Sequence, residues 1–269
     1  MQMAAFMGAA APAGVSKAAD TDAPTGAEAA CTGCGARDWA ALVEQGGFRW
    51  WRCGRCGFAR LFPMPEAARA EIAGDAIGRS YIEGYRAKLE KKMRRSAKRV
   101  RRLARRMPGK RLLDVGSNIG CLVEAGRRMG LDTTGVEINR TLFDFAHEAY
   151  PACRFIAGAI EEAPLERAAF DGLYCSEVIE HVPDNDRFVA ALASLLRAGG
   201  VLFLTTPGAH EYVDRGGHAR ARDFGAPDHK LYHTRESLSA LLARHGFGRI
   251  RFVFNFGRGL KAFAVKQPA

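Results

Sequence analysis

The stretch from Arg111 to Asn139 constrains the fold of this chain more than any other part of the sequence. Arg111–Val115 is a short apolar run that ends at a glycine, which is typical of a buried strand. Gly116–Gly120 predicts a tight turn, Cys121–Met129 a helix with one apolar face, and Thr133–Ile138 a second strand with an acid near its end. The order of strand, glycine turn, helix, strand and acid is how a parallel α/β sheet holds a nucleoside.

The acid, glycines and asparagine of this stretch are spaced as Asp114-x-Gly116-x-Asn118-x-Gly120, which departs from the dinucleotide pattern G-x-G-x-x-G. The arrangement resembles motif I of the class I S-adenosylmethionine (SAM) methyltransferases, acid-x-Gly-x-Gly-x-Gly, with Asn118 in place of the middle glycine. Because asparagine tolerates the left-handed conformation, the turn is expected to form. Glycines bring backbone N–H groups close to a ligand, and the acid can accept hydrogen bonds from both ribose hydroxyls. The resemblance implies that SAM contacts Asp114, Gly116, Ser117, Asn118, Gly120, Glu137 and Ile138.

After this stretch the sequence continues to alternate between predicted helices and strands. Helices are expected at Arg140–Ala149, Asp186–Leu196 and Ser237–His245, and strands at Arg154–Ile156, Phe170–Cys175, Val201–Thr205, Arg249–Phe254 and Lys261–Val265. This alternation predicts an α/β fold with a doubly wound sheet. The resemblance covers about Lys110 to Val265, and it implies the seven-stranded, mostly parallel sheet of the Rossmann-like methyltransferase fold.

A second motif supports the same family. Phe170–Leu173, followed by Ser176–Asp184, resembles the segment after strand four in ubiquinone-biosynthesis O-methyltransferases and their relatives. Ser176 is expected at the carboxyl end of a strand, where open α/β sheets bind ligands. Relatives often carry an acid after strand three that bonds the adenine amine, whereas this chain has Ala159 there. Adenine contact would then fall to backbone groups around Ala159 and Ile160, or to Glu161.

Candidate residues for chemistry on the methyl acceptor lie in two segments. If a helical turn follows strand four, Glu177, Glu180 and His181 share one face, and two carboxylates with an imidazole can bind a divalent cation. The resemblance implies a magnesium-like ion there that would lower the pKa of an acceptor hydroxyl. The alternative is that Glu180 and His181 only cap and pack the motif. His229 lies in a stretch that resembles one in sugar and quinone O-methyltransferases. It is the candidate base, with His181 as a second catalytic candidate and a structural surface histidine as the alternative.

Four of the seven cysteines form two C-x-x-C pairs separated by eighteen residues, Cys31 with Cys34 and Cys53 with Cys56. This spacing matches a four-thiolate zinc site. Phe48–Arg52 between the pairs predicts a strand, so residues 29–62 are expected to form a zinc ribbon. Four thiolates close the coordination shell, which favours a structural role. Disulfides are the alternative, but nothing marks this chain as secreted.

The positive charge of the protein comes from one segment. The net charge is +11, and Arg86–Arg111 holds fourteen Lys or Arg and one acid, so the rest of the chain is close to neutral. Apolar residues recur at helical spacing from Leu89 to Met107, which predicts an amphipathic helix with a dense positive face. This face could bind nucleic acid phosphates, an anionic membrane surface or acidic substrate, or simply be solvated.

Four parts of the chain are therefore expected. They are a flexible leader over residues 1–28, the ribbon over 29–62, a connector with the basic helix over 63–107, and the methyltransferase domain over 108–269. The leader is rich in Ala, Gly and Pro, and its weak apolar stretch has no basic segment before it, so a signal peptide is not expected. No apolar run reaches the roughly 20 residues of a membrane helix. A cytoplasmic location is expected.

These patterns predict a SAM-dependent methyltransferase that carries structural zinc and, if the Glu177–His181 site binds, magnesium. The favoured reaction is O-methylation of a small-molecule or glycan-linked hydroxyl. Two alternatives remain open. An RNA methyltransferase would use the ribbon and the basic helix to hold phosphates. A non-catalytic zinc-ribbon adaptor would carry a degenerate methyltransferase core. The sequence does not predict the acceptor or the oligomeric state.

Overall fold

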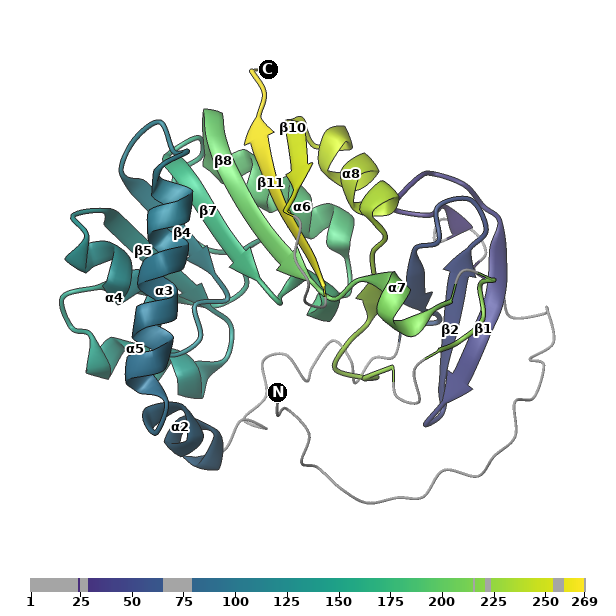
Figure 1. Ribbon diagram of the computed structural model, residues 1–269, viewed down its shortest axis with the longest axis horizontal. Coiled ribbons are helices and arrows are strands. Elements are labelled where there is room, and N and C mark those ends of the chain that lie inside the picture. Colours follow the sequence, from purple (N-terminus) through teal and green to yellow (C-terminus); the bar gives the residue numbers. More distant parts are fainter. Residues whose placement is uncertain are drawn as a thin grey trace.

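The computed structural model describes residues 24, 29–64, 79–214, 216–220, 224–253 and 259–268. Most of the predicted leader, residues 65–78 of the predicted connector and the end of the strand expected at Arg249–Phe254 lie outside the described residues. Figure 1 shows a large sheet flanked by helices and a smaller sheet beside it. Across the described residues, no helix combines the length and apolarity needed to cross a membrane.

The large sheet has seven strands. Their spatial order is β10 (Phe247–Phe252), β11 (Leu260–Lys266), β8 (Leu196–Thr206), β7 (Phe170–Ser176), β4 (Arg111–Val115), β5 (Asp132–Glu137) and β6 (Arg154–Ala157). β4 pairs in parallel with β5 and β7, and β11 is antiparallel to both of its neighbours. The predicted seven-stranded doubly wound fold is confirmed. The chain order reverses at β4, so the carboxyl ends of β4, β5 and β7 form the expected ligand edge.

Helices cover both faces of this sheet because neighbouring residues of each strand point to opposite sides. Leu112 packs with α3 (Leu89–Ala104) and α4 (Cys121–Arg128), whereas Leu113 packs with α6 (Asn185–Leu195) and α8 (Arg235–Arg244). In Figure 1, α3 crosses in front of the sheet and α6 lies behind it. The remaining helices are α2 (Arg79–Arg86), α5 (Arg140–Ala149) and α7 (Ala209–Tyr212).

Several predicted boundaries differ from the structure by one to three residues, and the largest displacement is at the start of β8. The expected strand at Val201–Thr205 begins five residues earlier, at Leu196, because α6 passes directly into β8. Leu196 pairs with Phe170 of β7 across a register shift, which extends the strand toward the helix.

The four-cysteine segment forms the smaller sheet. Its strands are β1 (Trp39–Gln45), β2 (Phe48–Cys53), β3 (Ala59–Leu61) and β9 (Leu231–Tyr232). The fourth strand comes from far outside residues 29–62 and directly precedes α8. Phe58 and the buried cysteines also share an apolar cluster with Leu238 and Leu241 of α8. This segment, which corresponds to the predicted ribbon and is called the ribbon from here on, is therefore joined to the rest of the protein through both a shared sheet and a shared apolar core.

The basic segment forms α3, as predicted. Val100 and Leu103 are buried against the main sheet, and Met93 and Ala97 pack beside them. The opposite face exposes Lys91, Arg94, Arg95, Lys98, Arg99, Arg101 and Arg102. The helix therefore docks by one apolar stripe and presents a positive surface.

A buried histidine links α6, α8 and the ribbon, and it predicts a pH-dependent stability. His233 has no exposed surface; its ring lies 3.1 Å from the Ser237 hydroxyl and 3.2 Å from the Asn185 amide. Burial lowers its pKa to about 3. The unfolded histidine protonates near pH 6.5, so stability falls as pH drops below that value, by about 2 kcal/mol at pH 5. Protonation of buried Glu180 stabilises the fold over the same pH range and so opposes this loss. The contribution of His233 is therefore the difference between wild type and His233→Gln in how far the free energy of unfolding changes from pH 7 to pH 5, measured by denaturant melts. An equal pH dependence in both proteins would contradict the assignment.

Candidate functional site

The glycine turn at the end of β4 has the geometry that its sequence predicts. Gly116, Asn118 and Gly120 all adopt positive φ, at 71°, 52° and 78°. A Cβ on Gly116 would lie 2.5 Å from a methyl of Val178, and one on Gly120 would lie 2.7 Å from the ring of Phe155. Both positions therefore require glycine for conformation and for space. Asn118 supplies the left-handed residue between them.

The backbone N–H groups of this turn point into the protein rather than toward a ligand. Those of Gly116 and Ser117 donate to the Val136 carbonyl at 2.9 and 3.0 Å, and that of Asn118 donates to the Glu137 carboxylate at 2.6 Å. The expectation that these groups face the cofactor is therefore wrong for these three residues. They tie the turn to β5 instead. The Ser117 hydroxyl is buried without a hydrogen-bond partner among the described residues.

Glu137 lies at the end of β5 as predicted, beside the turn. Its second carboxylate oxygen accepts from the Asn139 N–H at 2.9 Å, and its exposed fraction is 6%. Burial raises the pKa of this carboxyl, while the backbone donors oppose the shift. Burial and the nearby Glu137 raise the pKa of Asp114 well above its ordinary value. Each oxygen of Glu137 has a further lone pair, so the carboxylate can still accept from two ribose hydroxyls.

The loop after β6 completes this edge of the sheet. The Gly158 N–H donates to the Glu137 carbonyl at 2.9 Å, which brings the next residues beside the acid. Ala159 is partly exposed and Ile160 is buried, and neither offers a side-chain hydrogen bond. Ile138, directly after β5, is also partly exposed. The residues predicted to contact the cofactor thus gather around the ends of β4, β5 and β6, with Ser176 at the end of neighbouring β7.

The segment after β7 differs from its predicted form. Glu177 has φ of +56°, and the following 3-10 helix covers only Ile179–His181. The prediction that Glu177 shares a helical face with Glu180 and His181 is therefore wrong. Its carboxylate instead accepts from the Thr205 hydroxyl at 2.7 Å, and that hydroxyl lies 2.8 Å from the hydroxyl of Ser176.

Glu180 and His181 remain together at this edge. Glu180 is fully buried; one carboxylate oxygen accepts from Thr206 at 2.9 Å, and the other has no hydrogen-bond partner among the described residues. Burial and the charge of Glu177 raise the pKa of Glu180 to about 8. His181 places Nε2 3.9 Å from the unpaired oxygen and Nδ1 3.0 Å from the Asp228 carboxylate. Burial lowers the pKa of His181, but the hydrogen bonds to Asp228 and the charges of Glu180 and Asp228 together outweigh burial and raise it overall.

The structure brings His229 to this pair. Its ring contacts the His181 ring edge-on at 4.8 Å, and one ligand atom from each of Glu180, His181 and His229 lies within 4.8 Å of the others. His229 Nδ1 lies 3.0 Å from the Tyr232 hydroxyl, which itself donates to the Phe224 carbonyl. Because a tyrosine has one proton, Nδ1 must be the donor to Tyr232. A neutral ring then carries its lone pair on Nε2.

Sequence reasoning missed the supporting hydroxyls and the phenol of Tyr232. Thr205 and Thr206 hold Glu177 and Glu180, and they follow the apolar run Val201–Leu204 at the ligand edge. That change from apolar to polar residues at a strand end was an available signal. Tyr232 sits in a two-residue strand, for which the sequence carries no comparable pattern.

The four predicted ligand cysteines converge. The Sγ atoms of Cys31 and Cys56 lie 3.6 Å apart, as do those of Cys34 and Cys53, and all four lie within 4.8 Å of one another. None of them forms a disulfide. The pKa of Cys31 falls to about 5 because Cys56 hydrogen-bonds to it, and the same contact raises that of Cys56. A tetrahedral ion with Zn–S bonds of ~2.3 Å separates its sulfurs by roughly 3.8 Å, so the residues fit zinc.

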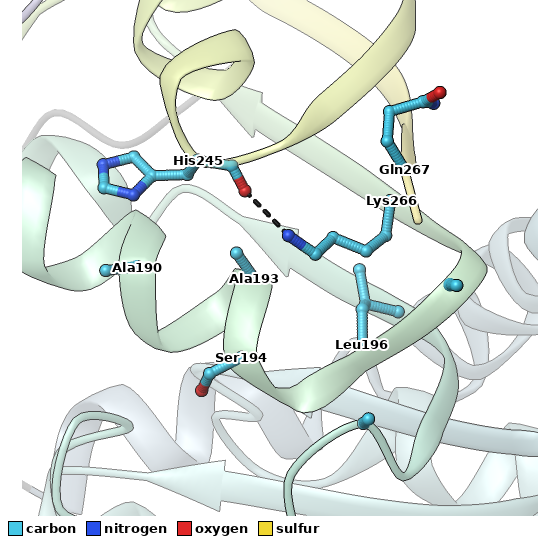
Figure 2. Close-up of a pocket in the computed structure, with 9 residues that line it drawn as sticks. Ala190, Ala193, Ser194, Leu196, His245, Lys266 and Gln267 are labelled. Atoms are coloured by element: carbon cyan, nitrogen blue, oxygen red, sulfur yellow. Dashed lines mark hydrogen bonds between the residues drawn. The ribbon is translucent and has the colours of Figure 1, made fainter. Parts of the chain in front are cut away.

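A separate pocket lies at the opposite edge of the sheet, near the start of β8 and the end of β11. It encloses about 480 Å³ and is lined by Ala190, Ala193, Ser194, Leu196, His245, Lys266 and Gln267, among others. Figure 2 shows the Lys266 ammonium turned to the carbonyl oxygen of His245, to which it donates at 3.0 Å. The pocket contains none of the predicted site residues.

Comparisons with known proteins agree with this fold. The methyltransferase-domain family matches residues 85–250, more than half of the chain, so the protein belongs to that family. The fold is that of the class I SAM-dependent methyltransferases. A SAM-dependent methyltransferase from Clostridium acetobutylicum superimposes with a TM-score of 0.54 at 13% identity, covering 70% of this chain and 98% of that one. One from Mesorhizobium loti gives a TM-score of 0.51 at 19% identity, covering 60% and 93%.

Among curated proteins, the chain is similar to the ubiquinone biosynthesis O-methyltransferase of Xanthomonas campestris pv. campestris. The two are 37% identical over 105 residues, which is 37% of this chain and 44% of that protein. The chain thus spans less than half the length of this relative.

Proposed function

We propose that this protein is a SAM-dependent methyltransferase that methylates the hydroxyl of a small molecule. The observation that carries the proposal is the juxtaposition at one sheet edge of the glycine turn with Glu137 and the cluster of Glu180, His181 and His229. Membership of the methyltransferase-domain family supports the cofactor. The similarity to a protein named as an O-methyltransferase supports a hydroxyl acceptor.

The turn and Glu137 would hold the cofactor, which supplies an electrophilic methyl group when bound. Gly116 and Gly120 would let the turn pack closely against Val178 and Phe155, which shapes the ligand edge, and Glu137 would accept hydrogen bonds from the ribose. Backbone groups around Ala159 and Ile160, with Ile138, would border the adenine. The remaining task of the chain is to orient the acceptor and to promote loss of its proton.

The cluster of Glu180, His181 and His229 would act on the acceptor hydroxyl. One candidate ligand atom of each residue lies within 4.8 Å of those of the other two, and the carboxylate oxygen of Glu180 that has no hydrogen-bond partner among the described residues is buried. We propose that these three residues hold a divalent cation such as magnesium, which would lower the pKa of a coordinated hydroxyl. Without an ion, His229 is the base. Dependence of turnover on added magnesium, with zinc-loaded protein in magnesium-free buffer as the reference, distinguishes the two.

The positive face of α3 favours a second candidate, a hydroxyl on RNA. Seven exposed cations along one helix, with a single acid among its residues, suit a phosphate backbone. Methyl transfer to RNA would weaken steeply with added salt, whereas transfer to a neutral small molecule would change little. Transfer to a neutral glycan-linked hydroxyl would likewise change little with salt.

Incubation with radiolabelled SAM and separate panels of small hydroxyl compounds, oligosaccharides and RNA tests the proposal. Labelling of none of them by SAM-binding protein would contradict it.

The ribose contact of Glu137 gives one direct test. Glu137→Gln removes the negative charge and half of the carboxylate's acceptor capacity but retains an oxygen for the turn. We expect SAM affinity to fall on the order of tenfold, since a hydrogen bond to a charged group is worth about 1.5–3 kcal/mol. Calorimetric titration measures it, with exposed Glu148→Gln as the matched control. Unchanged affinity in Glu137→Gln would move the ribose contact elsewhere.

A further inference from the structure

The ribbon is hydrogen-bonded to the segment that carries His229. β3 pairs antiparallel with β9, with Ala59 opposite Tyr232 and Arg60 opposite Leu231. The Leu61 N–H also donates to the Lys230 carbonyl at 2.9 Å. The three residues that follow His229 are thus held by one short ribbon strand.

A second set of contacts connects the ribbon to the ring of His229 itself. Trp50 of β2 stacks on Tyr232, with ring centroids 5.1 Å apart. Gln45 of β1 accepts from the Phe224 N–H at 2.8 Å, and the Phe224 carbonyl accepts from the Tyr232 hydroxyl. Ribbon residues thereby fix the phenol oxygen that accepts the hydrogen bond from Nδ1 of His229.

The cysteine site is adjacent to these contacts. The Thr234 hydroxyl donates to the carbonyl of Cys56 at 2.7 Å, and a Cβ on Gly33 would lie 2.7 Å from that of Ser237. On its other side the same segment reaches the acceptor cluster, because the Lys230 N–H donates to the Glu180 carbonyl at 2.7 Å. The path from cysteine ligands to acceptor cluster is therefore continuous.

The pairing strands are too short to persist without an ordered ribbon. β3 has three residues and β9 has two. Small four-cysteine units obtain much of their folding free energy from the metal. The glycine turn and Glu137, by contrast, are held by β5 and its neighbours.

We infer that the four-cysteine site positions the acceptor side of the active site. Zinc at Cys31, Cys34, Cys53 and Cys56 keeps the segment from His229 to Tyr232 in register with Glu180, and its loss disables acceptor chemistry while cofactor binding persists. The inference rests on the proposed function for its catalytic consequence. The tether itself is independent of that function.

The test compares zinc-loaded full-length protein with protein stripped by a chelator under reducing conditions, and then with protein reloaded with zinc. Three quantities are measured: hydrogen exchange, the dissociation constant for S-adenosylhomocysteine, and methyl transfer. Stripping should remove protection at the Lys230–Tyr232 amides and lower turnover at least 30-fold. The dissociation constant for S-adenosylhomocysteine should stay within twofold, and reloading with zinc should restore both the amide protection and the turnover.

Retained protection at the Lys230–Tyr232 amides of the stripped protein would overturn the inference. Loss of both S-adenosylhomocysteine binding and amide protection across the main sheet would also overturn it. A zinc-loaded protein that binds no S-adenosylhomocysteine would instead contradict the proposed function, and the exchange measurement would still test the tether. Tyr232→Phe provides a variant that keeps the metal. It should retain zinc and cofactor affinity but lose about tenfold in kcat. An unchanged kcat would remove Tyr232 from the path.

Discussion

Gly116→Ala is expected to lower the affinity for SAM on the order of 100-fold. The new Cβ would lie 2.5 Å from the Cγ2 methyl of Val178, at a φ of +71° that alanine adopts only with strain. The left-handed conformation costs about 1–2 kcal/mol and overpacking about 1–3 kcal/mol. Because we propose that the turn holds the cofactor, we expect its displacement to weaken SAM binding. Calorimetric titration with SAM measures the loss.

Two variants make this expectation specific. Gly130→Ala places the same strain at a φ of +77°, with no described atom within 4 Å of the new Cβ, and it should leave SAM affinity unchanged. Val178→Ala, added to Gly116→Ala, removes the clashing methyl and should recover part of the affinity. Equal losses of SAM affinity in Gly116→Ala and Gly130→Ala would mean that the backbone strain of a left-handed alanine, rather than its clash with Val178, weakens binding.

Glu180→Gln should lower kcat on the order of 100-fold, within the range that a group acting on a transferred proton contributes. The variant should fold, because the raised pKa of Glu180 means that a neutral side chain already suits this buried place. Glutamine also retains an oxygen for Thr206. SAM affinity should stay within twofold, since we propose that Glu180 acts on the acceptor rather than on the cofactor.

Glu148→Gln, which changes an exposed carboxylate on α5, is the matched control and should leave kcat unchanged. If wild-type turnover requires magnesium, Glu180→Gln should also lose its response to the ion. Full activity in Glu180→Gln would exclude the cluster from the reaction.

Local pattern predicted the sheet well because its central strands β4, β5 and β7 are buried along almost their whole length, and strands buried on both faces are rich in apolar residues. The strand at Arg111–Val115 and the helix at Arg140–Ala149 agree with the structure to the residue. Asn139 caps that helix by accepting from the Leu142 N–H. The left-handed Asn118 was also predictable, since few other residues adopt that conformation.

The acceptor side was harder to predict because it depends on contacts between distant segments. His229 reaches Glu180 and His181 through a loop whose path is set by pairing of β9 with the ribbon, and a two-residue strand has no periodicity. Helical spacing suggested a role for Glu177, but its positive φ turns it away from the helix that follows. The donors of the glycine turn were misassigned for a similar reason, since only the tertiary structure brings Val136 beneath them.

The most direct test of the account is calorimetric titration of the folded, zinc-loaded protein with SAM and with S-adenosylhomocysteine. The account predicts one site per chain with a dissociation constant in the micromolar range for both ligands, and a loss on the order of 100-fold in Gly116→Ala but not in Gly130→Ala. Absence of binding by protein that melts cooperatively would contradict it.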